Sequence, residues 1–321
     1  MKKIFILIIN IFILLFISSC NNKLLESNVK NIESDNNLNQ EFEILDYNLF
    51  NGDELIFLKH QEPAQMMSVI FKTKNNKIIV FDGGRKGDAN FLVNVINSYN
   101  INTVDAWFIS HIHDDHIGAL LEVIENFREK LYIKNIYYKF ADINWYYEKM
   151  GDDAGYVNLI LYYFNEYKKY CEQKNLIVNF HDNIKKFDKY IIDDVSVNVI
   201  NDLYLLDSDP INNTSIVYRM DVLNKKVMIL GDIGWYGGDA ILKSCDINEL
   251  KSDVVILSHH GQNGCGYELY EAIAPQYALW PTTKYIYENV DNIYKTNETI
   301  EWMDKLKVIN ILGFKANYIL K

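Results

Sequence analysis

The segment Ser110 to Gly118, which reads SHIHDDHIG, places the strongest constraint on what this chain can fold into. Three histidines and two aspartates fall within the six consecutive residues His111 to His116. The apolar run 104–109 precedes the segment and predicts a buried strand, whereas Gly118 to Ile124 carries apolar residues at helical spacing. We therefore expect these histidines and aspartates on a turn between a strand and a helix.

Imidazole and carboxylate groups at this density indicate a metal site. Neutral imidazole nitrogens and carboxylate oxygens suit zinc, manganese or iron. Their number exceeds what a single tetrahedral ion needs, which predicts a site for two ions. The alternative is a polar loop that happens to hold histidines, and it does not account for so many of them in one place.

The pattern His-x-His-x-Asp-His at residues 111–116 resembles the signature of the metallo-β-lactamase superfamily. Shorter motifs extend the resemblance in the order Asp82-Gly83-Gly84, Asn212-x-x-Ser215, Gly231-Asp232 and Ser258-His259-His260-Gly261. This order is most similar to the branch that contains the hydrolase domain of the bacterial DNA-uptake competence protein and the phosphorylcholine esterases. The resemblance covers residues 43 to 320. It implies an α/β fold, an αββα sandwich of two mixed β-sheets with helices on the outer faces.

The resemblance also implies a set of metal ligands. It divides six residues between two ions: His111, His113 and Asp232 for one, and Asp115, His116, His260 and again Asp232 for the other. Asp232 would thus bridge the two ions, although a plain Gly-Asp turn is the alternative. His260 is preferred to His259 as the last ligand because it directly precedes a glycine. His259 would then support a ligand or donate a proton.

Further residues are expected to support these ligands. Asp82 either accepts a hydrogen bond from a ligand imidazole or caps the following helix, and the sequence leaves both open. Asn212 and Ser215 are placed beside the ligands by the resemblance. His181 is the sole histidine between residues 116 and 232. Because a lone histidine is weak evidence for a ligand, we predict that it is a solvated loop residue.

The first 19 residues predict a signal peptide. They combine a basic start with the apolar run Ile4 to Ile17, which is too short for a comfortable membrane span. Residues 17–20, Ile-Ser-Ser-Cys, resemble a bacterial lipobox, which implies cleavage before Cys20 and lipidation of its sulfur. An uncleaved anchor and an ordinary secretory signal are the alternatives. Residues 20–42 predict a flexible tether, so the protein is expected at the cell membrane, lipid-anchored and facing outside the cytoplasm.

Residues 43–321 are predicted to form one hydrolase domain. The chain is 49% hydrophobic and 14% aromatic, which is ample for a packed core. A helical insertion is expected near 140–175, where four tyrosines recur at helical spacing: Tyr156, Tyr163, Tyr167 and Tyr170. Packing of this aromatic face on the core is favoured. The alternative is a lid whose aromatic residues contact the substrate, for example through cation–π interactions.

Hydrophobic periodicity and turn residues predict the remaining elements. Strands are expected at 43–49, 54–58, 67–72, 77–81, 132–140, 176–180, 190–193, 195–200, 215–221, 226–230 and 253–257. Helices are expected at 89–99, 122–128 and 155–173. Residues 267–321 predict helix, strand, helix and strand, which would close the second layer.

The net charge of the chain restricts its binding partners. A net charge of −11 argues against a protein that coats nucleic acid, because phosphate binding relies on clustered Lys and Arg. No stable nucleic-acid partner and no protein partner are inferred.

Besides Cys20, the cysteines at 171, 245 and 265 are odd in number and widely spaced, so they predict no disulfide framework. Each is expected to be a small buried residue, with a metal role for Cys265 as the alternative.

The sequence thus predicts a surface-tethered, metal-dependent hydrolase. Two ions, with zinc expected, would activate a water molecule and bind ester oxygens. Asp115 and Asp232 would orient the nucleophile. The leaving group would receive a proton from His259, a bound water, Tyr236 or Tyr267. The branch resemblance favours a phosphodiester or phosphate ester, in a small molecule or a polymer. A carbonyl substrate (lactone, thioester or β-lactam) and a metal-binding lipoprotein without turnover are the alternatives.

Overall fold

The computed structural model describes residues 42–174, 176 and 178–321. The predicted signal peptide, Cys20 and the tether up to residue 41 lie outside the described residues. Residue 42, which we expected in the tether, is instead the first residue of a strand, because it pairs with Asn317 in a parallel ladder. No helix in the described ranges is long and apolar enough to cross a membrane.

The first sheet has eight strands in the order β1-β17-β2-β3-β4-β6-β8-β9. Its strands are β1 (Phe42–Leu45), β2 (Glu54–Phe57), β3 (Ser68–Lys72), β4 (Ile78–Asp82), β6 (Ala106–Phe108), β8 (Asn135–Tyr137), β9 (Asn179–His181) and β17 (Asn317–Leu320). A separate parallel pair is formed by β5 (Thr103–Val104) and β7 (Tyr132–Ile133). Antiparallel pairing joins β2, β3 and β4, whereas β4, β6, β8 and β9 are parallel.

The second sheet has seven strands in the order β10-β11-β12-β13-β14-β15-β16. They are β10 (Lys189–Ile192), β11 (Val195–Val199), β12 (Tyr218–Val222), β13 (Lys225–Ile229), β14 (Val254–Ile256), β15 (Tyr277–Trp280) and β16 (Ile309–Leu312). The pairs from β10 to β13 are antiparallel, and those from β13 to β16 are parallel. Both sheets are therefore mixed, as the sequence predicts.

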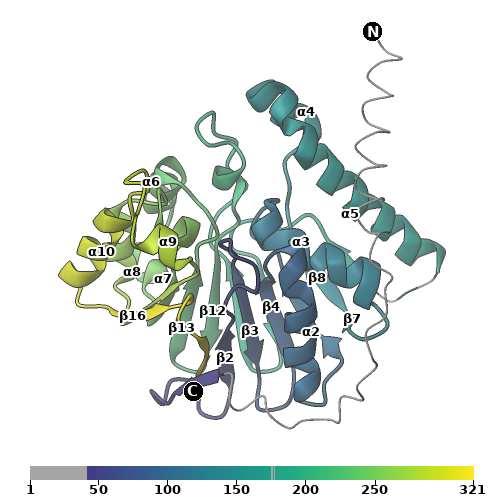
Figure 1. The fold of residues 1–321 in the computed structure, drawn as a ribbon, viewed down its shortest axis with the longest axis horizontal. Coiled ribbons are helices and arrows are strands. Elements are labelled where there is room, and N and C mark those ends of the chain that lie inside the picture. The colour runs from purple at the N-terminus through teal and green to yellow at the C-terminus, as the bar shows by residue number, and fades with distance from the viewer. Residues whose placement is uncertain (1–41, 175, 177) are drawn as a thin grey trace, which may run out of the picture. The chain divides into compact units, whose positions relative to one another are not determined.

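Helices cover the outer faces of both sheets (Figure 1). The α-helices are α2 (Ala89–Ser98), α3 (Asp114–Glu122), α4 (Ile143–Met150), α5 (Gly155–Gln173), α6 (Trp235–Ser244), α7 (Ile247–Leu250), α8 (Tyr267–Ile273), α9 (Lys284–Tyr287) and α10 (Thr296–Lys305). The 3₁₀ segments are η2 (Lys86–Asp88), η4 (Gly151–Ala154), η5 (Asn212–Thr214) and η6 (Ser258–Gly261), and η3 (Val123–Phe127) is a π-helical segment.

Alternating side chains of the strands build three hydrophobic layers. In β4, Ile79 and Phe81 face the second sheet, whereas Ile78 and Val80 pack against α2 and α3. In the second sheet, Val255 points outward to the layer that contains α6, α8 and α10. Strands buried on both faces read as continuous apolar runs, which is why the sequence shows them plainly. The layers confirm the predicted αββα sandwich.

The C-terminal strand corrects the predicted topology. We expected residues 267–321 to close the second layer, but β17 crosses to the first sheet and lies between β1 and β2. The segment also holds two helices, α9 and α10, between its strands where one was expected. Strand order depends on pairing between distant segments, and local sequence patterns do not encode it.

Several element boundaries also differ from the prediction. The strand expected at 132–140 is divided between β7 and β8, which pair with different neighbours. The strand expected at 43–49 ends at Leu45, and Asn48 adopts a left-handed conformation at φ 52°. The helix expected at 122–128 continues α3 as π-helical η3. Of the described residues in the strand expected at 176–180, Asn179 and Phe180 pair, because β9 begins at Asn179.

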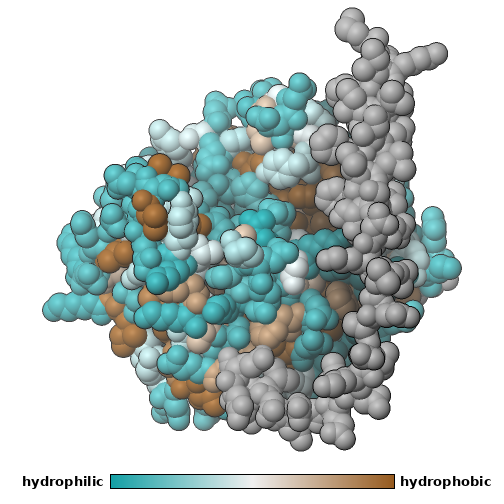
Figure 2. All heavy atoms as spheres, in the orientation of Figure 1, coloured by the Kyte–Doolittle hydropathy of each residue, from teal (hydrophilic) through white to brown (hydrophobic). Residues whose placement is uncertain are grey.

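The helical insertion has the predicted bounds for α5, but its tyrosines do not form one buried face. Tyr167 packs in the core with Phe164, whereas Tyr156 and Tyr163 are 41% and 55% exposed. The favoured prediction of a core-packed stripe is therefore wrong for these two residues. Figure 2 shows hydrophobic surface next to the region where Figure 1 draws α4 and α5. The N-terminal part of α5 extends beyond the sheet that would cover it.

Two hydrogen bonds join the sheets close to the histidine turn. The backbone N–H of Ile216 donates to the carbonyl of Ser110 at 2.9 Å. The hydroxyl of Tyr218 on β12 donates to the carbonyl of Ile109 at 2.9 Å. Because both acceptors lie on the turn after β6, these bonds fix the turn against the second sheet.

Replacing Phe108 tests the central layer. Its buried ring stacks with Phe81 and Tyr137 at centroid distances of 5.3 and 4.5 Å and meets Tyr218 of the second sheet edge-on at 5.2 Å. We expect Phe108→Ala to lower the free energy of unfolding by about 3–5 kcal/mol, because the cavity would lie between the sheets. Urea denaturation measures this loss. The matched control is Phe187→Ala, whose ring is 68% exposed; an equal loss in both variants would contradict the packing described here.

Candidate metal centre

The first histidines of the centre lie on the turn between β6 and α3. His111 and His113 bring Nε2 and Nδ1 to 2.9 Å of each other. α3 begins at Asp114, so Asp115 and His116 occupy its first turn and both side chains are buried. Strand and helix thus present the donors in the arrangement that the sequence predicts.

The second sheet supplies two more residues from neighbouring parallel strands. Asp232 follows β13 and His260 follows β14, so both lie at the same edge of the sheet. His259 and His260 are in the left-handed region at φ 48° and 58°. Such conformations are costly for residues other than glycine and occur mainly where the surroundings fix them. The hydrogen bond from His260 Nδ1 to the carbonyl of Pro281, at 2.6 Å, is one of those fixing contacts.

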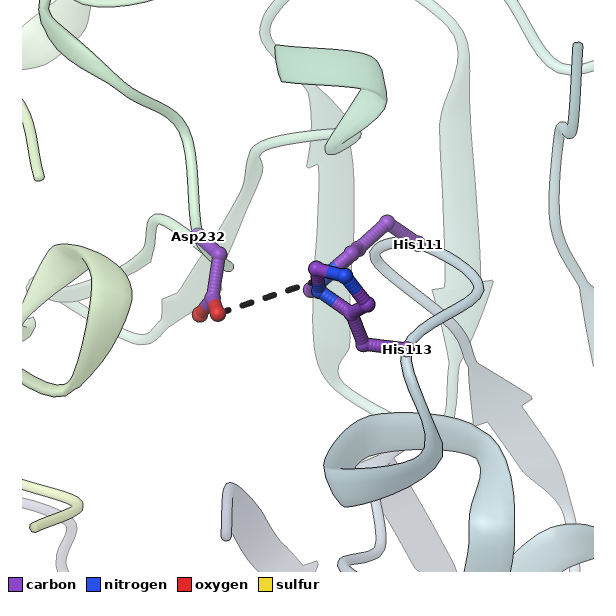
Figure 3. A group of neighbouring side chains, drawn as sticks. All are labelled: His111, His113 and Asp232. Carbon is purple, nitrogen blue, oxygen red and sulfur yellow. Dashed lines mark hydrogen bonds and ion pairs between the residues drawn. The ribbon is translucent and has the colours of Figure 1, made fainter. Parts of the chain in front are cut away.

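The structure brings the six predicted ligand residues into two groups. One group is His111, His113 and Asp232, which Figure 3 shows converging from the two sides of the site. The other group is Asp115, His116 and His260. Within each group the donor atoms lie within 4.8 Å of one another. The grouping agrees with the division between two ions that the resemblance implies, except that Asp232, which was expected in both sets, belongs to the first group alone.

Asp232 lies between the two groups. Its Oδ1 is 3.1 Å from His116 Nε2, and its Oδ2 is 3.4 Å from His260 Nε2. Oδ2 is also 3.8 Å from His111 Nε2, an approach drawn in Figure 3. A single buried carboxylate therefore contacts histidines of both groups, which is the placement that a bridging ligand requires.

Among the described residues, three buried imidazole nitrogens have no hydrogen-bond partner: His116 Nε2, His260 Nε2 and His259 Nδ1. His260 Nε2 lies 3.2 Å from Asp115 Oδ2, but neither this nitrogen nor His116 Nε2 is aligned with a neighbouring carboxylate for a hydrogen bond. Buried polar atoms are rarely left unpaired. Nitrogen lone pairs and carboxylate oxygens that converge without hydrogen bonding fit divalent cations, so these residues fit the metal site that the sequence predicts.

Electrostatics divide the histidines into two kinds. Burial lowers the pKa of His111 well below its usual value, and burial also lowers the pKa of His113. Both therefore present neutral rings, the form that binds metal. Burial opposes the charged form of His260, yet Asp232 and Asp115 raise its pKa to about 9. Burial likewise opposes charge on His116, but Asp232 and Asp82 hold its pKa well above the usual range. A proton and a cation compete for these positions.

Asp82 supports the centre from beneath. Its Oδ2 accepts a hydrogen bond from His116 Nδ1 at 2.7 Å. Its carboxylate also accepts from the Ser110 backbone N–H at 2.7 Å and the Ser110 hydroxyl at 2.8 Å. Of the two roles left open by the sequence, the structure favours orientation of an imidazole, which leaves His116 Nε2 directed at Asp232. Asp82 adopts φ 59°, and a Cβ on Gly83 would come within 2.7 Å of Trp107.

The other predicted supporting residues also border the centre. The Ser215 hydroxyl accepts from the backbone N–H of Asp232 at 3.0 Å. Asn212 Nδ2 lies 3.5 Å from His259 Nε2, which is itself 4.0 Å from Asp232 Oδ2. His259 is thus beside the centre without belonging to either donor group.

Sequence reasoning missed three residues that contact Asp115 or its neighbours. Gln65 Nε2 lies 3.4 Å from Asp115 Oδ2, and Arg85 Nη2 lies 3.5 Å from the same oxygen. Gln262 Nε2 donates to Gln65 Oε1 at 2.6 Å. Arg85 also pairs with Asp114. No local sequence pattern marks Gln65 or Arg85 as a site residue. Gln262 directly follows the His259-His260-Gly261 motif, and this position could have added it to the predicted site residues.

Two residues that we considered lie elsewhere. His181 belongs to β9, where its half-buried ring stacks on Tyr137 at 4.2 Å, so its prediction as a solvated loop residue is wrong. Cys265 is buried, and burial raises the pKa of its thiol to about 12. Neither residue is in a donor group, which argues against the metal role considered for Cys265.

Tyr156 connects the helical insertion to the centre. Its ring is parallel to that of His113, with centroids 6.2 Å apart. The insertion is fixed nearby by a small core in which Tyr146 and Val157 pack with Ile112 of the histidine turn. Of the four tyrosines considered for a lid, Tyr156 therefore lies beside the centre, and its contact with a substrate stays a prediction.

Comparisons with known proteins agree with this geometry. Residues 64–263 match the family described as the metallo-beta-lactamase superfamily. No curated protein matches the chain. The metallo-beta-lactamase fold protein YhfI from Bacillus subtilis is similar in structure, with 11% identity, a TM-score of 0.50, and coverage of 84% of this chain and 99% of that chain.

Two further solved structures are similar to the chain. One is CmlA, a diiron beta-hydroxylase from Streptomyces venezuelae, with 10% identity, a TM-score of 0.50, and coverage of 84% of this chain and 54% of that chain. The other is a diphosphatase from the PhnP family, with 13% identity, a TM-score of 0.40, and coverage of 71% and 84%. At such identities, the similarity to YhfI and CmlA shows the fold alone.

Removing the charge of Asp82 tests its support of the centre. We expect Asp82→Asn to weaken metal binding by about 10–100-fold, because His116 loses its charged acceptor while asparagine still tolerates the left-handed backbone. Competition with a chromogenic chelator measures the affinity. The control is Asp194→Asn at a surface pair with Lys74. Unchanged affinity in Asp82→Asn would remove Asp82 from this role.

Proposed function

The chain belongs to the metallo-β-lactamase superfamily, and from this premise we propose that it is a metal-dependent hydrolase of phosphodiester or phosphate-ester substrates. The observation that carries the proposal is the position of Asp232. Its buried carboxylate lies between two groups of histidine and aspartate donors. A site for two cations with a shared carboxylate suits hydrolysis better than a purely structural metal site, which keeps its coordination closed.

The two donor groups would hold the ions: His111, His113 and Asp232 one, and Asp115, His116 and His260 the other. Asp232 would also serve the second ion, since its carboxylate lies 3.1 Å from His116 Nε2 and 3.4 Å from His260 Nε2. When bound, such a pair lowers the pKa of water and neutralises the developing charge on the ester oxygens. Zinc is the expected metal, since imidazole with carboxylate suits it. Iron is the alternative, as in the structurally similar diiron protein CmlA.

The chain's own residues have separate tasks in this proposal. The carboxylates of Asp115 and Asp232 accept hydrogen bonds from the attacking water and orient it. Arg85, beside Asp115, adds positive charge near the ester. His259 lies at the side of the centre, with its side chain 17% exposed, and is placed to give a proton to the leaving group.

A phosphoester is preferred to a carbonyl substrate for two reasons. The order of motifs resembles the branch with the phosphorylcholine esterases, and the cationic side chain of Arg85 borders the centre beside Asp115. A lactone, thioester or β-lactam would call for an apolar cleft around the same ions. Hydrolysis of such compounds alone, or metal binding without turnover, is the outcome that would replace this proposal.

We also propose that the protein is anchored outside the cytoplasm by lipid on Cys20. The support is the lipobox-like segment 17–20 after a short apolar run. This anchor would confine hydrolysis to substrates that reach the outer face of the cytoplasmic membrane or the space beyond it.

Replacing Asp232 tests the centre and the activity together. We expect Asp232→Ala to lose bound metal and to lower the rate on chromogenic phosphodiesters by more than about a hundredfold, because ion-mediated charge stabilisation is worth several kcal/mol. Metal analysis and initial rates on the full chain in detergent measure both, with a lactone and a cephalosporin as counter-substrates.

His181→Ala is the control for this experiment, since His181 lies on β9 outside both donor groups. It should keep the metal content and rate of the wild type. Full occupancy and full rate in Asp232→Ala would remove Asp232 from the site. Loss of metal from His181→Ala would require a different ligand set.

Replacing Cys20 tests the anchor. We expect the wild type, produced in a bacterium with labelled fatty acid, to incorporate the label, and Cys20→Ala to fall to background, because the thiol is the acceptor of the lipid. The control is Cys245→Ala, which should label like the wild type. Label in Cys20→Ala, or none in the wild type, would exclude lipidation at this residue.

A further inference from the structure

We propose that a cavity beside the second donor group binds a second anionic group of the substrate, a phosphate or a carboxylate, separate from the ester that is cleaved. This inference rests on the proposed function and deepens it. It assigns the residues that would distinguish a substrate with two anionic groups from one with a single anionic group.

The cavity has a volume of about 640 Å³. Five separate parts of the chain line it: the segment between β2 and β3, Arg85 before η2, Gln262 after η6, the segment around α9, and Phe314 between β16 and β17. Its polar lining includes Lys59, His60, Gln65, Arg85, Gln262 and Lys284. Phe314 and Tyr294 add apolar surface, so the anion would be attached to an organic group.

Two contacts make the cavity continuous with the proposed metal centre. Gln65 and Arg85 line the cavity and also contact Asp115 Oδ2, at 3.4 and 3.5 Å. His260 also donates to the carbonyl of Pro281, and the lining residues Thr283 and Lys284 follow two and three residues later. A substrate whose ester lies at the centre can therefore extend into the cavity.

The charge of the lining is opposite to that of the protein. The chain carries −11, yet lysine, arginine and histidine line the cavity and no carboxylate does so among the described residues. Acidic side chains do contact residues of the lining: Asp114 and Asp115 contact Arg85, and Glu288 pairs with Lys284. Asp88 accepts from the backbone N–H groups of Gln61 and Arg85.

The cations differ in how far they are free to bind a ligand. Arg85 is held by Asp114 and Asp115, so its main effect is to position Asp115. Lys59 forms no ion pair within the described part of the chain. Lys284 pairs with Glu288 at 3.5 Å, but both side chains are largely exposed, and such pairs are weak. Lys59 and Lys284, which come from different segments of the lining, are the residues we assign to the anion.

The test compares two substrates that differ by one phosphate: the p-nitrophenyl ester of thymidine monophosphate, and the same ester with a second phosphate on the sugar. For the full chain in detergent at low salt, we expect the second phosphate to lower KM about tenfold, as charge-assisted hydrogen bonds allow. The double variant Lys59→Ala, Lys284→Ala should abolish this preference with little change in kcat. Added salt should reduce the preference in the wild type.

The control is Lys189→Ala, at the exposed edge strand β10 of the second sheet, which should keep the preference. Equal KM values for the two esters in the wild type would overturn the inference. So would a preference that survives in the double variant.

A binding measurement separates this inference from the proposed function. Calorimetric titration with thymidine bisphosphate and thymidine monophosphate reports the cavity without requiring turnover. If neither ester is cleaved but the bisphosphate binds about tenfold more tightly in a Lys59- and Lys284-dependent manner, the hydrolase proposal fails and the anion subsite stands. Equal binding of the two nucleotides overturns the subsite whether or not the esters are cleaved.

Discussion

The burial of ionisable side chains where the two sheets meet is the constraint on which this structure depends. Asp82, Asp232 and His260 are almost completely removed from solvent. Isolated charges in such a place cost several kcal/mol each, so they persist only with partners of opposite charge. Asp82 has Ser110 and His116 as partners, but Asp232 and the histidines around it are matched to one another without good hydrogen bonds. Divalent cations would supply the missing partners of these buried groups. The stability of the fold and the binding of metal therefore depend on the same residues.

The architecture supplies this site at the carboxyl ends of parallel strands. β4 and β6 end beside each other in the first sheet, and β13 and β14 do so in the second. Strand ends of both sheets therefore bring their side chains close to one another. Two hydrogen bonds, from Ile216 and Tyr218 to the turn after β6, set the separation of the halves. The left-handed residues Asp82, His259 and His260 are tolerated because neighbouring contacts fix them.

Specificity in the proposed reaction comes from the segments that surround the strand ends. On one side, the residues before β3 and around α9 form the cation-lined cavity. On the other, the helical insertion brings Tyr156 against His113. The metal centre itself could hydrolyse either a phosphate ester or a carbonyl substrate, since one fold supports many chemistries. Loops that differ in charge on its two sides would therefore decide which substrate reaches it.

The sequence by itself determined the αββα class, the strand-turn-helix that carries residues 111–116, and the membership of Asp232 and His260 in the candidate centre. The strand-turn-helix rests on local periodicity, whereas the αββα class and the choice of Asp232 and His260 rest on the resemblance of short motifs to a known family. The tertiary structure alone decided that β17 returns to the first sheet and that Asp82 accepts a hydrogen bond from His116. It also decided that Gln65 and Arg85 contact Asp115. These depend on which distant segments pair, and pairing is settled by the burial of whole faces rather than by neighbouring residues.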